Sequence, residues 1–199
     1  MLNTQRPAQQ GFTLLELLVV LIIGAILLSI AVPSMTYMIR NNSVGAAAEV
    51  IQNALRQAEG EAIRRNGEVD FILTDGTPSV ATVGSLTAKA DGDNWVVRMA
   101  DSTAANRYVN GISTSQMSSD VVYQGPAGVR FNGSGRVLDL SSAPVGSKQV
   151  FRVSRASATV AYCVFVTPGG AVKMCDPSKA SGDPRACQPM LSATDCPAA

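Results

Sequence analysis

Residues 11 to 33 read Gly-Phe-Thr-Leu-Leu-Glu-Leu-Leu-Val-Val-Leu-Ile-Ile-Gly-Ala-Ile-Leu-Leu-Ser-Ile-Ala-Val-Pro. The apolar run from Phe12 to Val32 is long enough to cross a bilayer, because about 20 helical residues at about 1.5 Å each cover the hydrocarbon. Glu16 interrupts the run near its start, where a carboxylate in lipid costs about 2.5 kcal/mol or more. The stretch therefore predicts a membrane helix whose carboxylate needs a partner.

The segment before this run has the features of a leader peptide. Met1 to Gly11 is short and polar, carries Arg6 and no acidic residue, and ends in a glycine directly before the apolar run. A secretory signal peptide is instead cleaved after its apolar stretch. Cleavage after Gly11 would leave the apolar helix on the mature chain, with Phe12 as its first residue.

The motif Gly11-Phe12-Thr13-Leu14-Leu15-Glu16 resembles the processing site of type IV prepilins and type II secretion pseudopilins. The resemblance implies that a prepilin peptidase cuts after Gly11, that Phe12 becomes N-methylated, and that Glu16 meets the terminal amine of a neighbouring subunit. A carboxylate and an ammonium attract strongly in low dielectric, and either alone is costly, so the pair can set the register between subunits. The alternative is an uncleaved single-pass anchor.

Beyond Pro33 the helical periodicity continues in an amphipathic form, with charged residues between the apolar ones. The apolar stripe consists of Val44, Ala47, Ile51, Leu55, Ala58 and Ala62. We expect one helix from Phe12 to about Asn66, ending at Asn66-Gly67. Pro33 should kink it or open a gap in its backbone hydrogen bonding, unless the proline starts a second helix.

From Glu68 onward, short β-type segments alternate with turn residues. The expected strands are Val69 to Thr74, Trp95 to Met99, Val121 to Gln124, Val129 to Asn132, Arg136 to Leu140, Gln149 to Ser154, Thr159 to Thr167 and Ala171 to Cys175. The stretches from Leu86 to Asp93 and from Asp101 to Asp120 are small and polar, and we expect loops there. The predicted fold class is α+β, with a long N-terminal α-helix packed on an antiparallel β-sheet head, as in type IV pilins.

The expected organisation has five parts: a prepilin leader (1–11), a transmembrane and filament-core helix (12–33), an amphipathic helix packed on the head (34–66), a β-sheet head domain (67–175) and a disulfide-tied C-terminal tail (176–199). Three later features resemble the GspH/FimT branch of pilin-like proteins. They are Ala-x-x-Glu-Ala at 58–62, Val-x-Phe-Asn-Gly-Ser-Gly at 129–135, and a late strand, Gly-Gly turn and strand ending in Cys. Members of this branch are minor pilins or minor pseudopilins. The resemblance therefore favours a minor subunit over a major pilin.

Composition restricts the chemistry of the chain. It contains 16 basic and 15 acidic residues and no histidine. Without histidine, Ser-His-Asp, Cys-His and HExxH arrangements are excluded, so we expect no enzyme and no catalytic residues. We also expect no cofactor. The cysteines fall late in the chain, which indicates an oxidising compartment such as the periplasm.

The four cysteines allow three disulfide connectivities. If Pro168-Gly169-Gly170 is a three-residue hairpin loop, Cys163 faces Cys175 across the two strands. Directly opposed side chains can form a disulfide if the residue pair is not hydrogen-bonded. This scheme predicts Cys163–Cys175 and Cys187–Cys196. A zinc site is disfavoured because paired Cys-x-x-Cys spacings are absent.

Two ligand hypotheses remain open. Asp91-Gly92-Asp93-Asn94 is similar to the start of a calcium loop, but Ser102 stands where the loop glutamate belongs, so a solvated turn is favoured and no metal is expected. Some relatives in transformation pili bind DNA through C-terminal basic residues. Candidate DNA contacts here are Arg152, Arg155 and Lys173, although relatives often show Gly-Arg-x-Arg where this chain has Gly170-Ala171-Val172-Lys173.

The resemblance implies a minor pilin, a low-copy structural subunit that helps prime or cap type IV pilus assembly through helix–helix and head–head contacts. Its partners would be other pilins and minor pilins, the prepilin peptidase and the inner membrane. The expected location is the bacterial inner membrane with a periplasmic head, then the pilus filament at or near the tip. The alternatives are a GspH-like minor pseudopilin of type II secretion and a DNA-binding minor pilin for DNA uptake.

Overall fold

The computed structural model describes residues 13–101, 103, 107–113, 116, 120–189, 191 and 194–197. Helix α1 (Leu14–Arg65) comes first and the strands follow. These are β1 (Val69–Thr74), β2 (Asn94–Met99), β3 (Tyr108–Ile112), β4 (Val121–Gln124), β5 (Gly128–Phe131), β6 (Val137–Leu138), β7 (Gln149–Arg155), β8 (Tyr162–Val166) and β9 (Val172–Cys175). The α+β class is confirmed.

Helix α1 has a defined signal at each end. The hydroxyl of Thr13 accepts a hydrogen bond from the Glu16 backbone N–H at 3.2 Å, as an N-cap residue does. At the other end Asn66 adopts a left-handed conformation with φ of 48°. Asn66 N–H donates to Ile63 O and Gly67 N–H donates to Ala62 O, which is a Schellman motif. The predicted end at Asn66-Gly67 is confirmed.

Pro33 lies inside this continuous helix, so it does not start a second one. Proline has no N–H, and the carbonyl of Ser29 therefore lacks its usual donor four residues on. The kink that Pro33 predicts stays a prediction.

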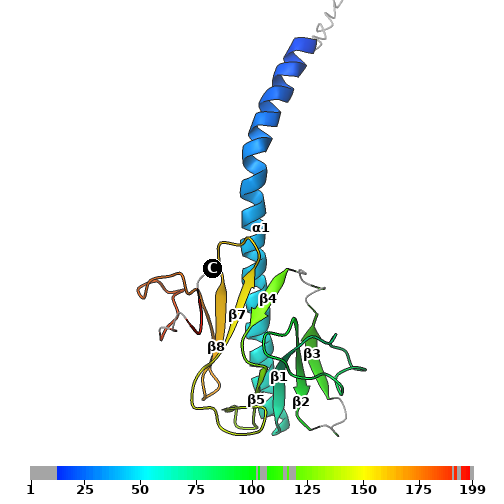
Figure 1. Cartoon of the computed structure of the whole chain (residues 1–199), viewed down its shortest axis with the longest axis vertical. Coiled ribbons are helices and arrows are strands. Elements are labelled where there is room, and N and C mark those ends of the chain that lie inside the picture. The colour runs from blue at the N-terminus through cyan, green and yellow to red at the C-terminus, as the bar shows by residue number, and fades with distance from the viewer. Residues whose placement is uncertain are drawn as a thin grey trace, which may run out of the picture. The chain divides into compact units, whose positions relative to one another are not determined.

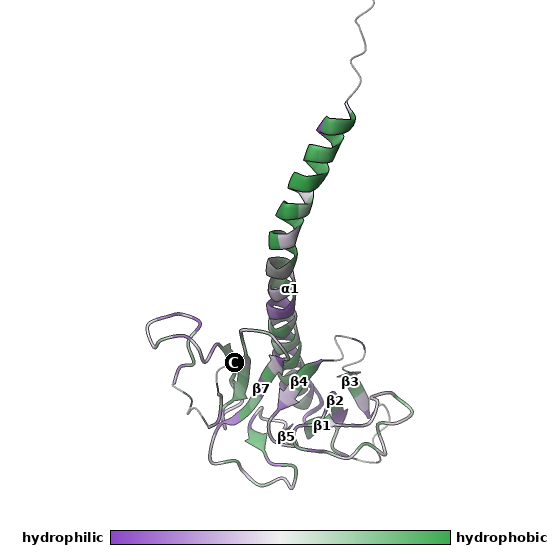
Figure 2. Ribbon diagram, turned by 45° about the horizontal axis from the view of Figure 1, so that its top comes forward, coloured by the Kyte–Doolittle hydropathy of each residue, from purple (hydrophilic) through white to green (hydrophobic). Residues whose placement is uncertain are grey.

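Contacts divide the chain into two units, Met1–Met38 and Ile39–Ala199. In the described part of the first unit, large apolar side chains are exposed on every side of the helix, from 82% at Leu14 to 46% at Val19. Figure 2 shows this stretch in the green of hydrophobic residues. A helix that is apolar all round suits a membrane or the core of a helical assembly.

The second unit contains two antiparallel sheets (Figure 1). Sheet A has the strand order β3-β2-β1-β5-β6, and sheet B has the order β4-β7-β8-β9. In sheet A, β1 pairs with β2 on one side and with β5 on the other. The strand expectations are confirmed apart from small differences at their ends.

Strand β3 (Tyr108–Ile112) corrects the expectation of a loop from Asp101 to Asp120. Asn110 and Gly111 break the strand-like pattern of its sequence, and both residue types are depleted in strands. The strand forms because β2 offers it a free edge, with Trp95 opposite Ile112 and a register shift next to Val97. Tertiary pairing therefore overrides local propensity at this position.

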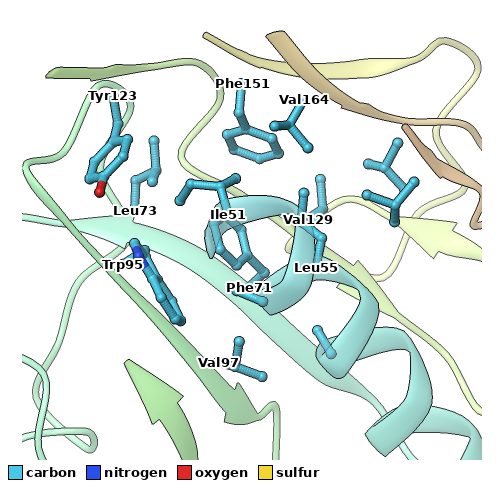
Figure 3. Close-up of a cluster of buried hydrophobic side chains, with 14 of the residues drawn as sticks. Ile51, Leu55, Phe71, Leu73, Trp95, Val97, Tyr123, Val129, Phe151 and Val164 are labelled. Atoms are coloured by element: carbon cyan, nitrogen blue, oxygen red, sulfur yellow. The ribbon is translucent and has the colours of Figure 1, made fainter. Parts of the chain in front are cut away.

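One core joins the second part of α1 to the inner faces of both sheets. In Figure 3, Ile51 and Leu55 of the helix lie among Phe71, Trp95, Phe151 and other side chains of the two sheets. The rings of Phe71 and Phe151 meet edge to face, with centroids 5.1 Å apart. The whole predicted apolar stripe is confirmed as buried, since each of its members has no exposed surface. These residues are Val44, Ala47, Ile51, Leu55, Ala58 and Ala62.

The outer face of each sheet is also covered. The loop from 75 to 93 packs Val83 and Leu86 on Ile72 and Val96 of sheet A. The tail after β9 packs Cys187 and Cys196 on the outer face of sheet B. Strand β1 is buried along its full length for this reason, although it belongs to an antiparallel sheet.

The predicted disulfide pairing is wrong. Cys163 and Cys175 do face each other across β8 and β9, as the hairpin argument requires. The bonds, however, join Cys163 to Cys196 and Cys175 to Cys187, with Cα–Cα distances of 6.2 and 4.8 Å.

The pairing follows from the type of strand pair. Thr167 N–H donates to Ala171 O, and hydrogen-bonded pairs recur at every second position. Cys163 and Cys175 are therefore a hydrogen-bonded pair, whose side chains stand further apart than those of the other type. Both sulfurs instead form disulfides with cysteines of the tail, which covers this face of the sheet.

Candidate functional site

Glu16 occupies the first turn of α1, in a segment otherwise made of apolar residues. The positive end of the helix dipole favours a carboxylate at this position. Thr13 and Glu16 also have the spacing of a capping box, in which a threonine at the helix start is followed three residues later by glutamate. This capping signal can be read from the sequence and marks the start of the helix.

The apolar neighbours of Glu16 make its exposure costly once water is removed. Leu15 and Leu17 are exposed, and the stretch that follows is long and apolar enough to cross a membrane. The polar side chains further along satisfy themselves on their own helix, since Ser29 Oγ donates to Ile26 O and Thr36 Oγ1 donates to Val32 O. Such bonds are what a helix in lipid requires. Within the described part of this unit, Glu16 is the one ionisable group between Thr13 and Val32.

The two processing residues, Gly11 and Phe12, lie outside the described residues. Pro33 is placed only as part of the helix backbone. Glu16 is therefore the one predicted processing or assembly side chain whose surroundings the structure describes.

The candidate DNA contacts do not form one face. Arg152 and Arg155 are three residues apart on β7, so their side chains lie on opposite faces of sheet B. Arg152 donates to Pro197 O at 2.8 Å and to Gln124 Oε1 at 2.6 Å. Arg155 donates to Asp120 Oδ2 and to Ser43 Oγ of α1. Lys173 is exposed. The two arginines bind other residues of the head, so they do not form a common basic face with Lys173.

A buried charge cluster on the outer face of sheet A was missed by sequence reasoning. Asp70 of β1 lies between Arg98 of β2 and Arg130 of β5 in the strand register. Arg130 binds Asp70 through two hydrogen bonds, at 2.6 and 3.2 Å. Arg98 Nε lies 3.8 Å from Asp70 Oδ2, and its Nη1 donates to the carbonyls of Val83 and Leu86.

The surroundings shift the pKa values of the Arg98 and Arg130 guanidinium groups in opposite directions. Burial lowers the pKa of Arg98, and the positive charge of Arg107 adds to this effect. The hydrogen bond to Asp70 raises the pKa of Arg130. Asp70 binds both arginines, and Arg98 in turn anchors the 75–93 loop through the carbonyls of Val83 and Leu86, so the cluster stabilises the fold.

The segment from Asp91 to Asp93 is a turn that leads into Asn94, the first residue of β2. Asp91 has φ of 56°, and its carboxylate accepts the Gly125 N–H at 2.7 Å. Asn94 donates to the carbonyls of Asp75 and Gly76. Among the described residues no group of three or more His, Cys, Asp or Glu side chains could hold a metal ion.

Sequence comparison agrees with this arrangement. Residues 6–32 match the prokaryotic N-terminal methylation motif, and residues 47–170 match the family described as type II transport protein GspH. The chain therefore belongs to the GspH family of type IV pilin-like proteins. No functionally curated protein matches it in sequence.

Two crystal structures of the type IV minor pilin FimU from Pseudomonas aeruginosa are similar to this chain. The first has 13% sequence identity and a TM-score of 0.49, covering 69% of this chain and 92% of that one. The second has 13% identity and a TM-score of 0.46, covering 68% and 94%.

Proposed function

We propose that the chain is a minor pilin, a low-copy subunit that helps to prime or cap a type IV pilus. The observation that supports this most strongly is the combination of the methylation motif with the exposed, apolar first part of α1, which carries one carboxylate in its first turn. Such a helix needs lipid or other helices around it. The GspH family membership and the covered faces of the head fit a structural subunit better than an enzyme.

In this proposal the prepilin peptidase removes residues 1–11, and Glu16 then binds the terminal amine of Phe12 in an adjacent subunit. The inner membrane holds the subunit until it enters the filament. The pair would form where water is excluded, so that losing either charge leaves the other uncompensated. We expect this charge pair to set the register between subunits more than to stabilise one subunit.

The test is the variant Glu16→Ala in the native host. The leader should be cleaved as in the parent protein, while the amount of the subunit in sheared filaments falls at least tenfold. Glu16→Gln should behave in the same way, and Glu16→Asp should keep part of the incorporation because it keeps the charge. Normal incorporation of the alanine and glutamine variants would refute the register role. Gly11→Leu is the matched control for processing, because it should leave an uncleaved band.

A second candidate is a minor pseudopilin of type II secretion, which the description of the matched family favours. Deletion of the gene separates the two functions. Loss of surface pili with normal protein secretion supports the minor pilin, and loss of secretion with normal pili supports the pseudopilin.

DNA binding ranks third because Arg152 and Arg155 are engaged within the fold. A gel-shift salt titration of the full chain in detergent tests it. No retardation even at low salt would remove this hypothesis.

A further inference from the structure

An open groove of about 320 Å³ runs beside β9, the last strand of sheet B. Helix α1 forms one wall and the disulfide-tied tail forms the other. Its lining includes Gln52, Arg56, Val172, Lys173 and Met174. Among all residues that line it in the described chain, two are cationic and none is acidic.

The floor of the groove is the unpaired edge of β9. Because Ala171 belongs to a hydrogen-bonded pair with Thr167, the backbone groups of Val172 and Met174 point away from β8. Side chains of α1 occupy two of them. Arg56 Nη2 donates to Val172 O at a long 3.5 Å, and Gln52, with its amide oxygen turned to the strand, accepts from Met174 N–H at 3.2 Å. Both contacts come from side chains that can rotate away.

The tail shows that this edge accepts a further strand. Asp176 N–H donates to Arg185 O at 2.8 Å, and Asp176 forms a parallel bridge with Ala186. To extend this parallel pairing toward the groove, Arg185 N–H would have to donate to Met174 O, but it donates to Asp183 Oδ1 at 2.8 Å instead. The pairing thus stops where the groove begins, and within the described residues the edge at Val172 to Met174 is bonded only by the α1 side chains and by no strand.

The two cations flank this edge from opposite sides. Arg56 reaches it from α1, on the inner face of sheet B, and Lys173 lies on the outer face together with Phe165. Side chains of an added strand alternate between the two faces. Neighbouring acidic residues in such a strand would therefore meet Arg56 and Lys173 in turn.

We propose that the edge of β9 is a docking site for an extended segment with two adjacent acidic residues, supplied by a neighbouring subunit and bound as an added strand. Backbone hydrogen bonds to Val172 and Met174 would give affinity, and the two cations would select the acidic pair. The nature of the neighbour rests on the proposed filament role. Binding of a peptide to the isolated chain does not depend on that role, so the two can fail separately.

The probe is a fluorescein-labelled peptide, Thr-Val-Thr-Glu-Asp-Thr-Val-Thr, titrated with the full chain in detergent micelles and followed by fluorescence anisotropy. We expect saturable binding, at least tenfold weaker binding when Glu-Asp is replaced by Gln-Asn, and none when the central residues are replaced by Pro-Pro. Absence of binding by the acidic peptide, or equal binding of all three, would overturn the proposal.

Variants of the chain test whether the acidic peptide binds in the groove. Arg56→Gln and Lys173→Glu should each weaken the acidic peptide about tenfold, and Lys173→Glu should gain affinity for a peptide with Lys-Lys at the centre. Arg136→Glu is the matched control, because Arg136 is exposed and lies beside a different groove. If Arg136→Glu weakens binding as strongly, the attraction is only general charge and the docking site is refuted. Circular dichroism of each variant confirms its fold.

Discussion

Cys163 and Cys175 lie directly opposite each other on β8 and β9, yet each forms its disulfide with a different cysteine of the tail. The two strands are already joined by their hairpin and its hydrogen bonds. A bond between them would close a short loop, whereas bonds to Cys196 and Cys187 fix the tail to the sheet. Cys175–Cys187 has a sequence separation of 12, the same as a Cys163–Cys175 bond would have, whereas Cys163–Cys196 has a separation of 33 and therefore constrains the unfolded chain more.

Non-reducing peptide mapping should recover a peptide that joins Cys175 to Cys187 and another that joins Cys163 to Cys196. Replacing Cys163 and Cys196 together by serine should lower the free energy of unfolding by about 2–4 kcal/mol, because the unfolded chain regains the freedom of the 33-residue separation. Urea unfolding monitored by tryptophan fluorescence measures this. A recovered peptide linking Cys163 to Cys175 would contradict the structure.

Asp70→Ala should destabilise the protein by about 3–5 kcal/mol, because it leaves the guanidinium groups of Arg98 and Arg130 without their buried partner. Asp75→Ala is the matched control, since Asp75 also binds a cation, Lys89, but its side chain is 50% exposed where that of Asp70 is 3% exposed. The control should change the free energy of unfolding far less, because solvent screens an exposed ion pair. Equal losses in thermal or urea unfolding would show that burial does not govern the Asp70 cluster.

Gly170→Ala should cost about 1–3 kcal/mol of stability. Gly170 has φ of 98°, and a Cβ atom there would collide with the carbonyl oxygen of Gly135 and crowd Glu59 Oε1. Gly146→Ala is the control because a Cβ at Gly146 meets nothing within 4 Å. The urea midpoint of the control should stay at or slightly above that of the parent protein. A Gly170→Ala midpoint equal to the parent's would contradict the close packing of the two hairpin turns.

Alkaline pH should unfold the protein partly through Tyr123. Burial raises the pKa of Tyr123 to about 12, from about 10 in the unfolded chain. Between these values the folded state holds a proton that the unfolded state has released, so stability falls as pH rises, by at most about 1.4 kcal/mol per pH unit. Tyr123→Phe should flatten this part of the stability–pH curve. An unchanged slope in urea titrations of that variant would show that Tyr123 ionises without linkage to folding.

Local signals predicted the helix, its end at Asn66-Gly67, the buried stripe and the strands other than β3. They succeed where periodicity and turn chemistry agree with the tertiary fold. Strand β3 contains Asn110 and Gly111 and exists because β2 offers an edge, which no short window of sequence displays.

Only part of the candidate site could be predicted from the sequence. The leader motif and Glu16 are local, and the family match supports the protein class that they predict. The Asp70 cluster joins residues from three strands at positions 70, 98 and 130, so sequence spacing gives no sign of it. The disulfides depend on the hydrogen-bonding type of one strand pair and on the path of the tail, and neither can be read from the spacing of the cysteines.

The bonds of the tail also have a mechanical meaning. Cys196 is joined covalently to β8, an inner strand of sheet B, while Cys187 is joined to its edge strand β9. A pull on this part of the chain is carried by two strands through covalent bonds, so the tail cannot peel away from the sheet one contact at a time. A filament subunit built in this way could bear load at its surface without first losing the cover of its head.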